Sequence, residues 1–403
     1  MMEDLDTMDQ RPRSSGPLAG VTVLELGTMY AAPTCGRMLR DFGADVIKVE
    51  DPIHGDYARQ WTPMKSGQSL GFARLNAGKR SVAIDLRTEA GRDLVRRLSG
   101  TVDVIIESFR PGRMAQWGMG YETLSADNPG LVLTSVSGFG QTGPYREKPG
   151  FGTVAETGSG FAYINGWPET PPTSPPFGFA DSLAGISAAM GTAMALFNRE
   201  RTGRGDHVDV ALYEPLMFML GDMVLNFTAT GHVQGRVGNG TGSASPRGVY
   251  EAADGKWLSI AASNQGIAAR LFAAMGCPEL IEDPRYATNA ERMKHNDELQ
   301  ERVTAWVGAQ SRQEVLDILE KFEVVCSSVN DSSDIVADPH FRERTLVEIT
   351  GSQALGRILT PGPVLHLASY DGPVYHGVPA IGEHTEEVLA ELLGDSETSD
   401  LVI

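Results

Sequence analysis

Short apolar runs alternate with amphipathic segments along the first third of the chain. Five runs have the length and β-branched content of buried strands: Val21–Leu26, Ala44–Glu50, Ser81–Leu86, Asp103–Ser108 and Leu131–Val136. Between them, helical patterns cover Ala32–Phe42, with Pro33 in its first turn and Gly43 just past its end, and Thr88–Leu98. Strands that alternate with helices of about a dozen residues predict βαβ units. We therefore expect an α/β fold with a Rossmann-like, doubly wound parallel sheet.

The middle of the chain continues this rhythm with a helix of unusual composition. The predicted helix Asp181–Asn198 is rich in alanine and glycine, so neighbouring backbones can approach it closely. A strand, His207–Leu212, and a second helix, Glu214–Thr230, follow it. A glycine-rich stretch, Val237–Ser243, comes next and has the composition of a mobile loop or a plain surface linker.

A change of pattern after this loop indicates a second domain. Its one clear strand, Trp257–Ala261, is followed by the helical segments Gly266–Met275, Asn289–Gln310 and Ser311–Phe322. A chain of 403 residues exceeds the ~250–300 at which one core usually stops growing. We predict a tail at 1–16, a large domain at 17–225, an inserted smaller α+β domain at 226–330, and a return to the large domain at 331–403.

Composition narrows the possible partners and compartment. The net charge of −18 disfavours nucleic acid, which requires a basic surface. No apolar run approaches 18 residues, and the polar first 16 residues have no apolar segment of the kind found in a signal peptide. Three scattered cysteines are typical of a reducing compartment. We expect a cytoplasmic protein without a membrane span.

Several common motifs are absent. The first strand-to-helix turn, Leu26–Tyr30, is not GxGxxG, and no Walker A, HExxH or GxSxG sequence occurs. The eight histidines are dispersed, with no pair at metal-binding spacing, so we predict no metal site.

Asp181 has two interpretations. Aspartate is a favoured N-cap, accepting backbone hydrogen bonds at the start of a helix. The same position suits a nucleophile, because a helix N-terminus favours a carboxylate in its charged form. A carboxylate can attack a thioester carbonyl and form a mixed anhydride. Local sequence does not separate the two.

The wider pattern resembles the family III coenzyme A-transferases from Pro17 to Gly394. The likeness rests on segments that occur in the family's order: PLAGVTVLELGTMYAAP, GADVIKVEDPIHGDYAR, LNAGKRSVAIDL, ESFRPGRMAQWGMGYE, SVSGFGQTGPYREKPGF, the helix beginning DSLAGISAAMG, DPHFRER and PAIGEHTEEVL. Any one segment is weak evidence, but together they are specific.

The resemblance implies roles for individual residues. Asp181 is expected to be the nucleophile, with Gly138 supplying backbone near the thioester. CoA is expected to be bound as a substrate, with no tightly held cofactor, along Met29, Tyr30, Ala31, Ser108, Phe109, Arg113 and Met114. Gly238, Gly240 and Gly242 are expected to form a flexible loop that shields the intermediate from water.

Three positions depart from patterns found in that family. Asp51 stands where some members place an arginine near the nucleotide, and Gln116 and Ser137 replace basic residues of the formyl-CoA enzymes. We therefore expect the CoA phosphates to find other cations, with Lys48, Arg59 and Arg80 as the candidates.

The function expected from the resemblance is transfer of CoA from an acyl-CoA donor to a carboxylic acid acceptor. The substrate is predicted to be a dicarboxylate or a short branched acid, and Arg247 is a candidate partner for a second carboxylate, although a solvated loop residue is the simpler interpretation. The resemblance also implies an interlocked homodimer.

Two alternatives remain open. An acyl-CoA racemase of the same fold needs acid–base groups on both faces of the α-carbon, and Phe151 stands where the racemases carry a histidine. A CoA-binding protein without catalysis is the other alternative.

Overall fold

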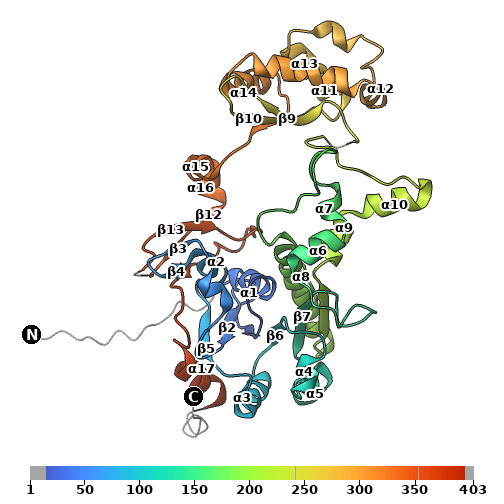
Figure 1. Ribbon diagram of the computed structural model, residues 1–403. Helices are drawn as coiled ribbons and strands as arrows, with labels where there is room; N and C mark the ends of the chain where they lie inside the picture. Colours follow the sequence, from blue (N-terminus) through green and yellow to red (C-terminus); the bar gives the residue numbers. More distant parts are fainter. Residues whose placement is uncertain (1–14, 241, 353, 395–403) are drawn as a thin grey trace, which may run out of the picture. The chain divides into compact units, whose positions relative to one another are not determined.

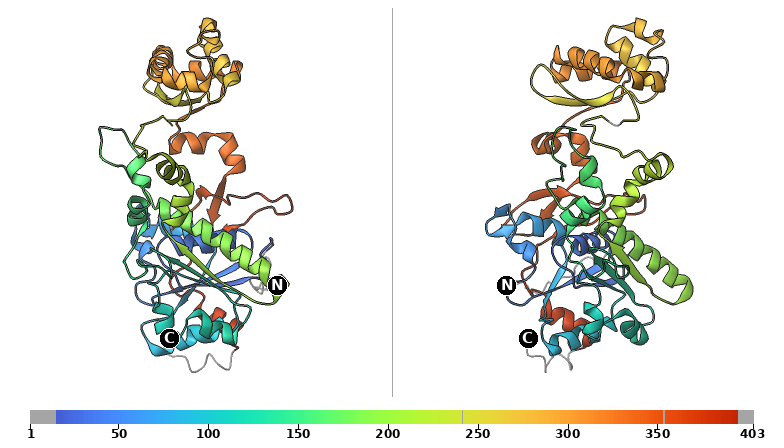
Figure 2. Two further views of the ribbon diagram at one scale, coloured as in Figure 1. Left: turned by 90° about the vertical axis from the view of Figure 1, so that its right-hand side faces the viewer. Right: turned by 45° about the vertical axis from the view of Figure 1, so that its right-hand side comes forward.

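The computed structural model describes residues 15–240, 242–352 and 354–394, which form two compact units (Figures 1 and 2). The larger unit comprises the described residues up to Ala162, then Ser174–Thr230 and the described residues from His340 onward. The smaller unit comprises Tyr163–Thr173 and the described part of Gly231–Pro339. The predicted domain boundaries lay at 226 and 330, with 163–173 in the large domain. Most of the predicted tail, residues 1–14, lies outside the described residues.

A six-stranded sheet forms the centre of the larger unit. Its order is β5-β2-β1-β6-β7-β8, and every neighbouring pair is parallel. The strands are β1 (Thr22–Glu25), β2 (Asp45–Glu50), β5 (Arg80–Ala83), β6 (Val104–Glu107), β7 (Val132–Ser137) and β8 (His207–Ala211). The predicted parallel α/β fold is thus confirmed.

Both faces of this sheet are covered by helices, as a parallel sheet requires. Val23 and Val104 point to one face, where they pack in a core with residues of α1 (Ala31–Asp41) and α8 (Phe179–Thr202). Leu24 and Ile105 point to the other, toward α3 (Glu89–Ser99), α5 (Tyr121–Asp127) and α17 (Thr385–Leu393). Figure 1 shows α17 beside β5 although almost the whole chain separates them. The alternation follows from the two-residue period of a strand.

Helix α8 packs against α1 and β7 (Figure 1). A Cβ atom on Gly185 would lie 2.5 Å from the carbonyl oxygen of Ala31, so the two helix backbones are in contact. Among the described residues, α8 is the one helix long and apolar enough to cross a membrane. Its small buried residues pack against α1 and the sheet, whereas Met190, Met194 and Phe197 on the same helix are exposed.

The remaining elements of the larger unit are short. They are η1 (Tyr57–Gln60), β3 (Met64–Lys65), β4 (Gln68–Ser69), α2 (Leu70–Asn76), α4 (Arg113–Gln116), α6 (Gly152–Gly158), α9 (Glu214–Met219), α10 (Gly221–Thr230), β12 (Leu346–Thr350), β13 (Ile358–Pro361) and β14 (Tyr375–His376). The single helix predicted for Glu214–Thr230 is wrong, because the chain turns at Leu220 and forms α9 and α10. Two helices, α7 (Phe161–Ile164) and α16 (Pro339–Arg344), include residues of both units.

The smaller unit has its own three-stranded sheet and core. Its antiparallel order is β11-β10-β9, from β9 (Arg247–Glu251), β10 (Trp257–Ala261) and β11 (Cys326–Ser328). Its other elements are α11 (Gln265–Ala274), η2 (Pro278–Ile281), α12 (Asn289–Lys294), α13 (Asn296–Gly308), α14 (Arg312–Lys321) and α15 (Ser332–Ala337). Phe272, Tyr286 and Leu299 belong to its buried core. The predicted helix Asn289–Gln310 is interrupted at His295.

Candidate active site

The order of the sheet creates a topological switch point between β1 and β6. The chain runs outward from β1 through β2 to β5, and in the opposite direction from β6 through β7 to β8. In open α/β sheets, ligands bind beyond the carboxyl ends of the strands at such a point. A Cβ atom on Gly27, just after β1, would lie 2.8 Å from Ser108 Oγ, just after β6. The two predicted CoA-binding segments, 29–31 and 108–109, therefore begin side by side.

The turn after β1 has a constrained backbone. Met29 has a φ of 70°, an uncommon value for a residue with a side chain. Its N–H donates to Asp56 Oδ1 at 3.0 Å, and Asp56 is buried. This hydrogen bond holds the turn from which Tyr30 and α1 follow.

Asp181 lies in the first turn of α8 but does not cap it. The helix begins at Phe179 and its N-cap residue is Gly178, so Asp181 is the third helical residue. Gly178 has no side chain that could make a cap hydrogen bond, and the Ala180 N–H in the first turn donates instead to Glu156 Oε1 at 3.3 Å. The N-cap interpretation is therefore wrong, and the carboxylate is left available for another role.

Two glycines make room for this carboxylate. A Cβ atom on Gly152 would lie 2.1 Å from Asp181 Oδ2, and one on Gly178 would lie 3.2 Å from the same oxygen. The Gly178 position also faces Tyr30, whose ring atoms would be 3.4 Å away. Asp181, Tyr30 and the start of α6 are thus close neighbours.

The electrostatics of Asp181 differ from the sequence expectation. Burial, and secondly the negative charge of Glu156, raise its pKa to about 6, while its own backbone N–H has a smaller opposing effect. Glu156 is itself buried, and its Oε1 accepts a hydrogen bond from the Ala180 N–H at 3.3 Å. The expectation that the helix N-terminus keeps the pKa of Asp181 low is therefore wrong. A carboxylate with a pKa near 6 is charged at neutral pH but poorly solvated.

Gly138 follows β7 and approaches the same segment from the other side. A Cβ atom there would lie 2.8 Å from the Gly150 Cα, so the two backbones touch. Gly138 and Asp181 therefore flank the short stretch Gly150–Gly152. No hydrogen bond within the described chain uses the Gly138 N–H.

The three predicted phosphate-binding cations are engaged inside the protein. Lys48 has no exposed surface, and its Nζ pairs with Glu25 at 2.9 Å and Asp56 at 2.8 Å. It therefore cannot reach a phosphate, and that expectation needs correction.

The two arginines are held in a similar way. Arg59 pairs with Glu50 at 2.6 Å and donates to the carbonyl of Pro379. Arg80 is buried between Asp45 and Glu391. Both guanidinium groups already have carboxylate partners, which argues against a phosphate role.

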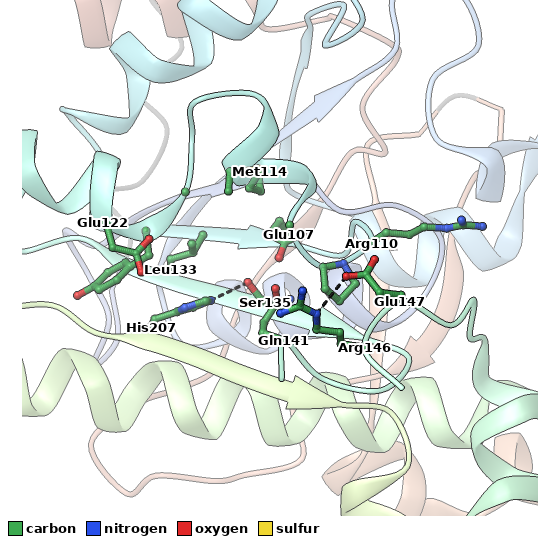
Figure 3. A pocket seen from close by; sticks show the side chains of 15 residues that line it. Glu107, Arg110, Met114, Glu122, Leu133, Ser135, Gln141, Arg146, Glu147 and His207 are labelled. Carbon is green, nitrogen blue, oxygen red and sulfur yellow. Dashed lines mark hydrogen bonds and ion pairs between the residues drawn. The ribbon is translucent and has the colours of Figure 1, made fainter. Parts of the chain in front are cut away.

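The other predicted CoA contacts lie around α4. Phe109 stacks edge-on against Trp117 with ring centroids 5.1 Å apart, and the Arg113 guanidinium lies 5.6 Å from the Trp117 ring. Met114 lines a pocket of ≈ 410 Å³, together with Arg110 and Arg146 (Figure 3). This pocket lies on the face of the sheet opposite α8, because its Leu133 belongs to that core.

A row of polar side chains crosses the floor of this pocket. Figure 3 shows Glu107, Ser135 and His207 on β6, β7 and β8. Ser135 Oγ lies 3.0 Å from His207 Nε2, and Glu107 Oε2 accepts from the Phe109 N–H at 2.7 Å. Burial raises the pKa of Glu107 to about 7 and lowers that of His207. The row places a buried carboxyl directly beneath the Ser108–Phe109 turn.

The predicted glycine loop belongs to the smaller unit. Gly238 has a φ of 60°, and a Cβ atom there would lie 2.8 Å from the Trp167 indole nitrogen. Gly240 is exposed and Gly242 has a φ of 65° with open space around it. The backbone of Gly238 donates to Gly166 at 3.0 Å, which ties the loop to the Tyr163–Thr173 segment.

Sequence reasoning missed the residues that surround Asp181. Glu156 and Gly152 set its charge and its space, yet nothing in the pattern of α6 indicated that this helix packs on α8. Glu107 begins the segment ESFRPGRMAQWGMGYE, in which nothing marks it as a buried carboxyl. Among the described residues, no cluster of three or more His, Cys, Asp or Glu is arranged to hold a metal ion.

Fold and site together define a class: a Rossmann-like α/β protein with a half-buried carboxylate near the turn that follows β1. The sequence pattern of CoA-transferase family III matches residues 18–385. The chain therefore belongs to CoA-transferase family III and is an enzyme of that type.

Individual relatives resemble the chain over nearly its full length. It is 41% identical over 389 residues to a succinyl-CoA–D-citramalate CoA-transferase from Chloroflexus aurantiacus, covering 96% of both chains. It is 35% identical to a succinate–glutarate CoA-transferase from Agrobacterium fabrum, covering 96% of this chain and 98% of that protein. A crystal structure of a CaiB/BaiF family protein from Brucella suis superimposes with a TM-score of 0.82 at 34% identity, covering 94% and 99% of the two chains.

Proposed function

We propose that this enzyme transfers CoA from a dicarboxylic acyl-CoA, such as succinyl-CoA, to a second carboxylic acid through a covalent intermediate on Asp181. The half-buried Asp181 carboxylate, with room made for it by Gly152 and Gly178, is the observation that supports this most directly. The relatives that are succinyl-CoA–D-citramalate and succinate–glutarate transferases support the substrate class.

The proposed reaction exchanges one activated acyl bond for another. The Asp181 carboxylate attacks the thioester carbonyl, the C–S bond breaks, and CoA leaves as a thiolate. The thiolate then attacks the aspartyl carbonyl of the mixed anhydride, which releases the donor acid and leaves an aspartyl thioester. The acceptor carboxylate attacks the aspartyl thioester, which releases CoA thiolate and forms a second mixed anhydride. The thiolate then attacks the acceptor's acyl carbonyl, which yields the new acyl-CoA and frees Asp181.

The surroundings of Asp181 suit this chemistry. Carboxylates and thiolates are the nucleophiles and leaving groups throughout, so no proton has to be transferred. Partial desolvation of the carboxylate makes it a better nucleophile than it is in water. The Gly138 N–H is a candidate donor to the oxyanion, a contact worth about 3 kcal/mol in other enzymes.

Racemisation fits the site less well. It requires an acid–base group on each side of the α-carbon. Phe151, next to Gly152, has an exposed side chain that cannot carry a proton. A binding protein without catalysis does not account for a half-buried carboxylate whose pKa is raised to about 6 and which packs against two glycines.

We place CoA along the carboxyl ends of β1 and β6, where Met29, Tyr30 and Ala31 face Ser108 and Phe109. Since Lys48, Arg59 and Arg80 are engaged, the phosphates need other cations. Arg110 follows Phe109, is exposed, and forms no ion pair within the described chain. We assign it as a phosphate partner, with Arg113 beside it.

The variant Asp181→Asn tests the mechanism. It should abolish CoA transfer and the hydroxylamine-sensitive acyl adduct that mass spectrometry detects in the wild-type enzyme incubated with succinyl-CoA. Because the folded enzyme holds the Asp181 proton more tightly than the unfolded chain, ionisation of Asp181 lowers stability as the pH rises from about 4 to about 6. The variant removes this cost and should be at least as stable as the wild type at pH 8. Normal turnover by this variant would exclude the mechanism.

The homodimer is also a proposal. The outer surfaces of α8, α9 and α10 expose large apolar side chains, among them Met190, Met194, Phe197, Phe218 and Phe227. Large apolar side chains exposed in such number usually lie in a protein interface. Light scattering after size-exclusion chromatography should give twice the mass of one chain, and a monomer would refute the proposal.

A further inference from the structure

Arg74, on α2, is a cation without a counter-ion beside the proposed acyl site. Its Nη2 atom is buried and has no hydrogen-bond partner, and the described chain offers it no ion pair. By contrast, Arg37 pairs with Asp41, and Arg59 pairs with Glu50. A buried guanidinium nitrogen that lacks a partner calls for an explanation such as a missing ligand.

The position of Arg74 connects it to the nucleophile. Its Cζ lies 5.1 Å from the centre of the Tyr30 ring. The same ring borders the Gly178 position, which in turn lies against Asp181 Oδ2. Arg74 and Asp181 are therefore neighbours of one aromatic ring within the larger unit.

The charges around Asp181 make this cation significant. Asp181 and the buried Glu156 are two carboxylates, and neither forms an ion pair within the described chain. A dicarboxylic acyl group brings a further negative charge into the same half-buried space. Burying that charge without a cation is strongly unfavourable.

We propose that Arg74 binds the distal carboxylate of a dicarboxylic acyl group whose other end reacts with Asp181. The inference rests on the proposed function and names the residue that selects its substrate class. The planar guanidinium, packed against Tyr30, presents N–H groups that suit two carboxylate oxygens. Tyr30 then serves both as the wall of the acyl site and as the support for Arg74.

The experiment compares two exchange reactions that each use a single acyl group. One is exchange of labelled succinate into succinyl-CoA, and the other is exchange of labelled butyrate into butyryl-CoA at higher enzyme concentration. Arg74→Met keeps the length and apolar stem of the side chain but removes its charge. It should lower kcat/KM for succinate exchange by about 30-fold or more, as expected when one member of a buried charge pair is removed, and change butyrate exchange by less than about threefold.

Further variants separate specificity from packing. Arg74→Lys should restore part of the succinate exchange, because it returns the charge without the planar fork. Arg285→Met is the matched control, since Arg285 lies 5.2 Å from the Tyr286 ring in the smaller unit, and it should leave the succinate-to-butyrate ratio unchanged. An equal loss of both exchanges in Arg74→Met, or no loss, would overturn the inference. The same holds if Arg247→Met, rather than Arg74→Met, shows the selective loss.

Failure of the proposed function gives a different result. In that case the wild type exchanges no acid, or Asp181→Asn exchanges as well as the wild type does. Normal wild-type exchange that requires Asp181, with an unaltered ratio in Arg74→Met, defeats the inference about Arg74 alone.

Discussion

Gly152→Ala places a single methyl group against the proposed nucleophile. The added Cβ would lie 2.1 Å from Asp181 Oδ2 and 3.0 Å from its carboxyl carbon. An ordinary carbon–oxygen contact is about 3.3 Å, so the carboxylate has to move by about 1 Å. The backbone of Gly152 has no positive φ, so alanine introduces no strain there beyond this contact.

The displacement is expected to slow catalysis in an enzyme that still folds. A misplacement of about 1 Å typically costs about 100-fold in rate, or about 2.7 kcal/mol of activation free energy. The overpacking costs about 1–3 kcal/mol of stability, and the better helix propensity of alanine in α6 offsets up to about 1 kcal/mol of that. The free energy of unfolding should therefore fall by no more than about 3 kcal/mol, which leaves the enzyme folded.

The assay is the succinate exchange rate at saturating substrate, with urea unfolding measured in parallel. Gly158→Ala is the matched control, because it lies in the same helix and a Cβ atom there has no neighbour within 4 Å. It should leave the exchange rate within about twofold of the wild type. If Gly152→Ala retained full activity with unchanged stability, Asp181 would not be confined as described.

Two further predictions concern pH and the buried ion pairs. The pKa of Asp181 is raised to about 6 and its charged form attacks, so kcat/KM should rise with pH. It should be about tenfold lower at pH 5 than on its plateau above pH 7. A flat profile between pH 5 and 7 would contradict this. Lys48→Met leaves Asp56 and one oxygen of Glu25 buried without a cation and should cost about 3–5 kcal/mol of stability in urea unfolding. Its control is Arg87→Met, which breaks the exposed pairs with Asp51 and Asp85 and should cost far less stability; equal losses would show that Lys48 is not the buried anchor of this turn.

The central sheet was predictable because its evidence is local. Each strand is a short apolar run, and a parallel sheet covered on both faces needs apolar residues at successive positions, as in Val23–Leu24 and Ile105–Ile106. The helix that carries Asp181 was recognisable from its small residues for the same reason. Its first residue was not, because Gly178 offers no capping side chain to mark the boundary.

The surroundings of Asp181 were decided by tertiary structure. Gly152, Glu156, Tyr30 and Arg74 come from α6, the β1–α1 turn and α2, and their proximity depends on how these elements pack. The sequence likewise did not reveal which basic residues form ion pairs inside the protein. Lys48, Arg59 and Arg80 look like free cations in the sequence, whereas the fold pairs each of them with at least one carboxylate.

By itself, then, the sequence determined the alternation of strands and helices, the family, and the carboxylate at the head of α8. Hydrophobic periodicity and motif order are properties of neighbouring residues, so they are visible before folding. Which charges are paired, which are buried, and which remain open to a substrate depends on contacts between distant segments, and only the folded chain decides these.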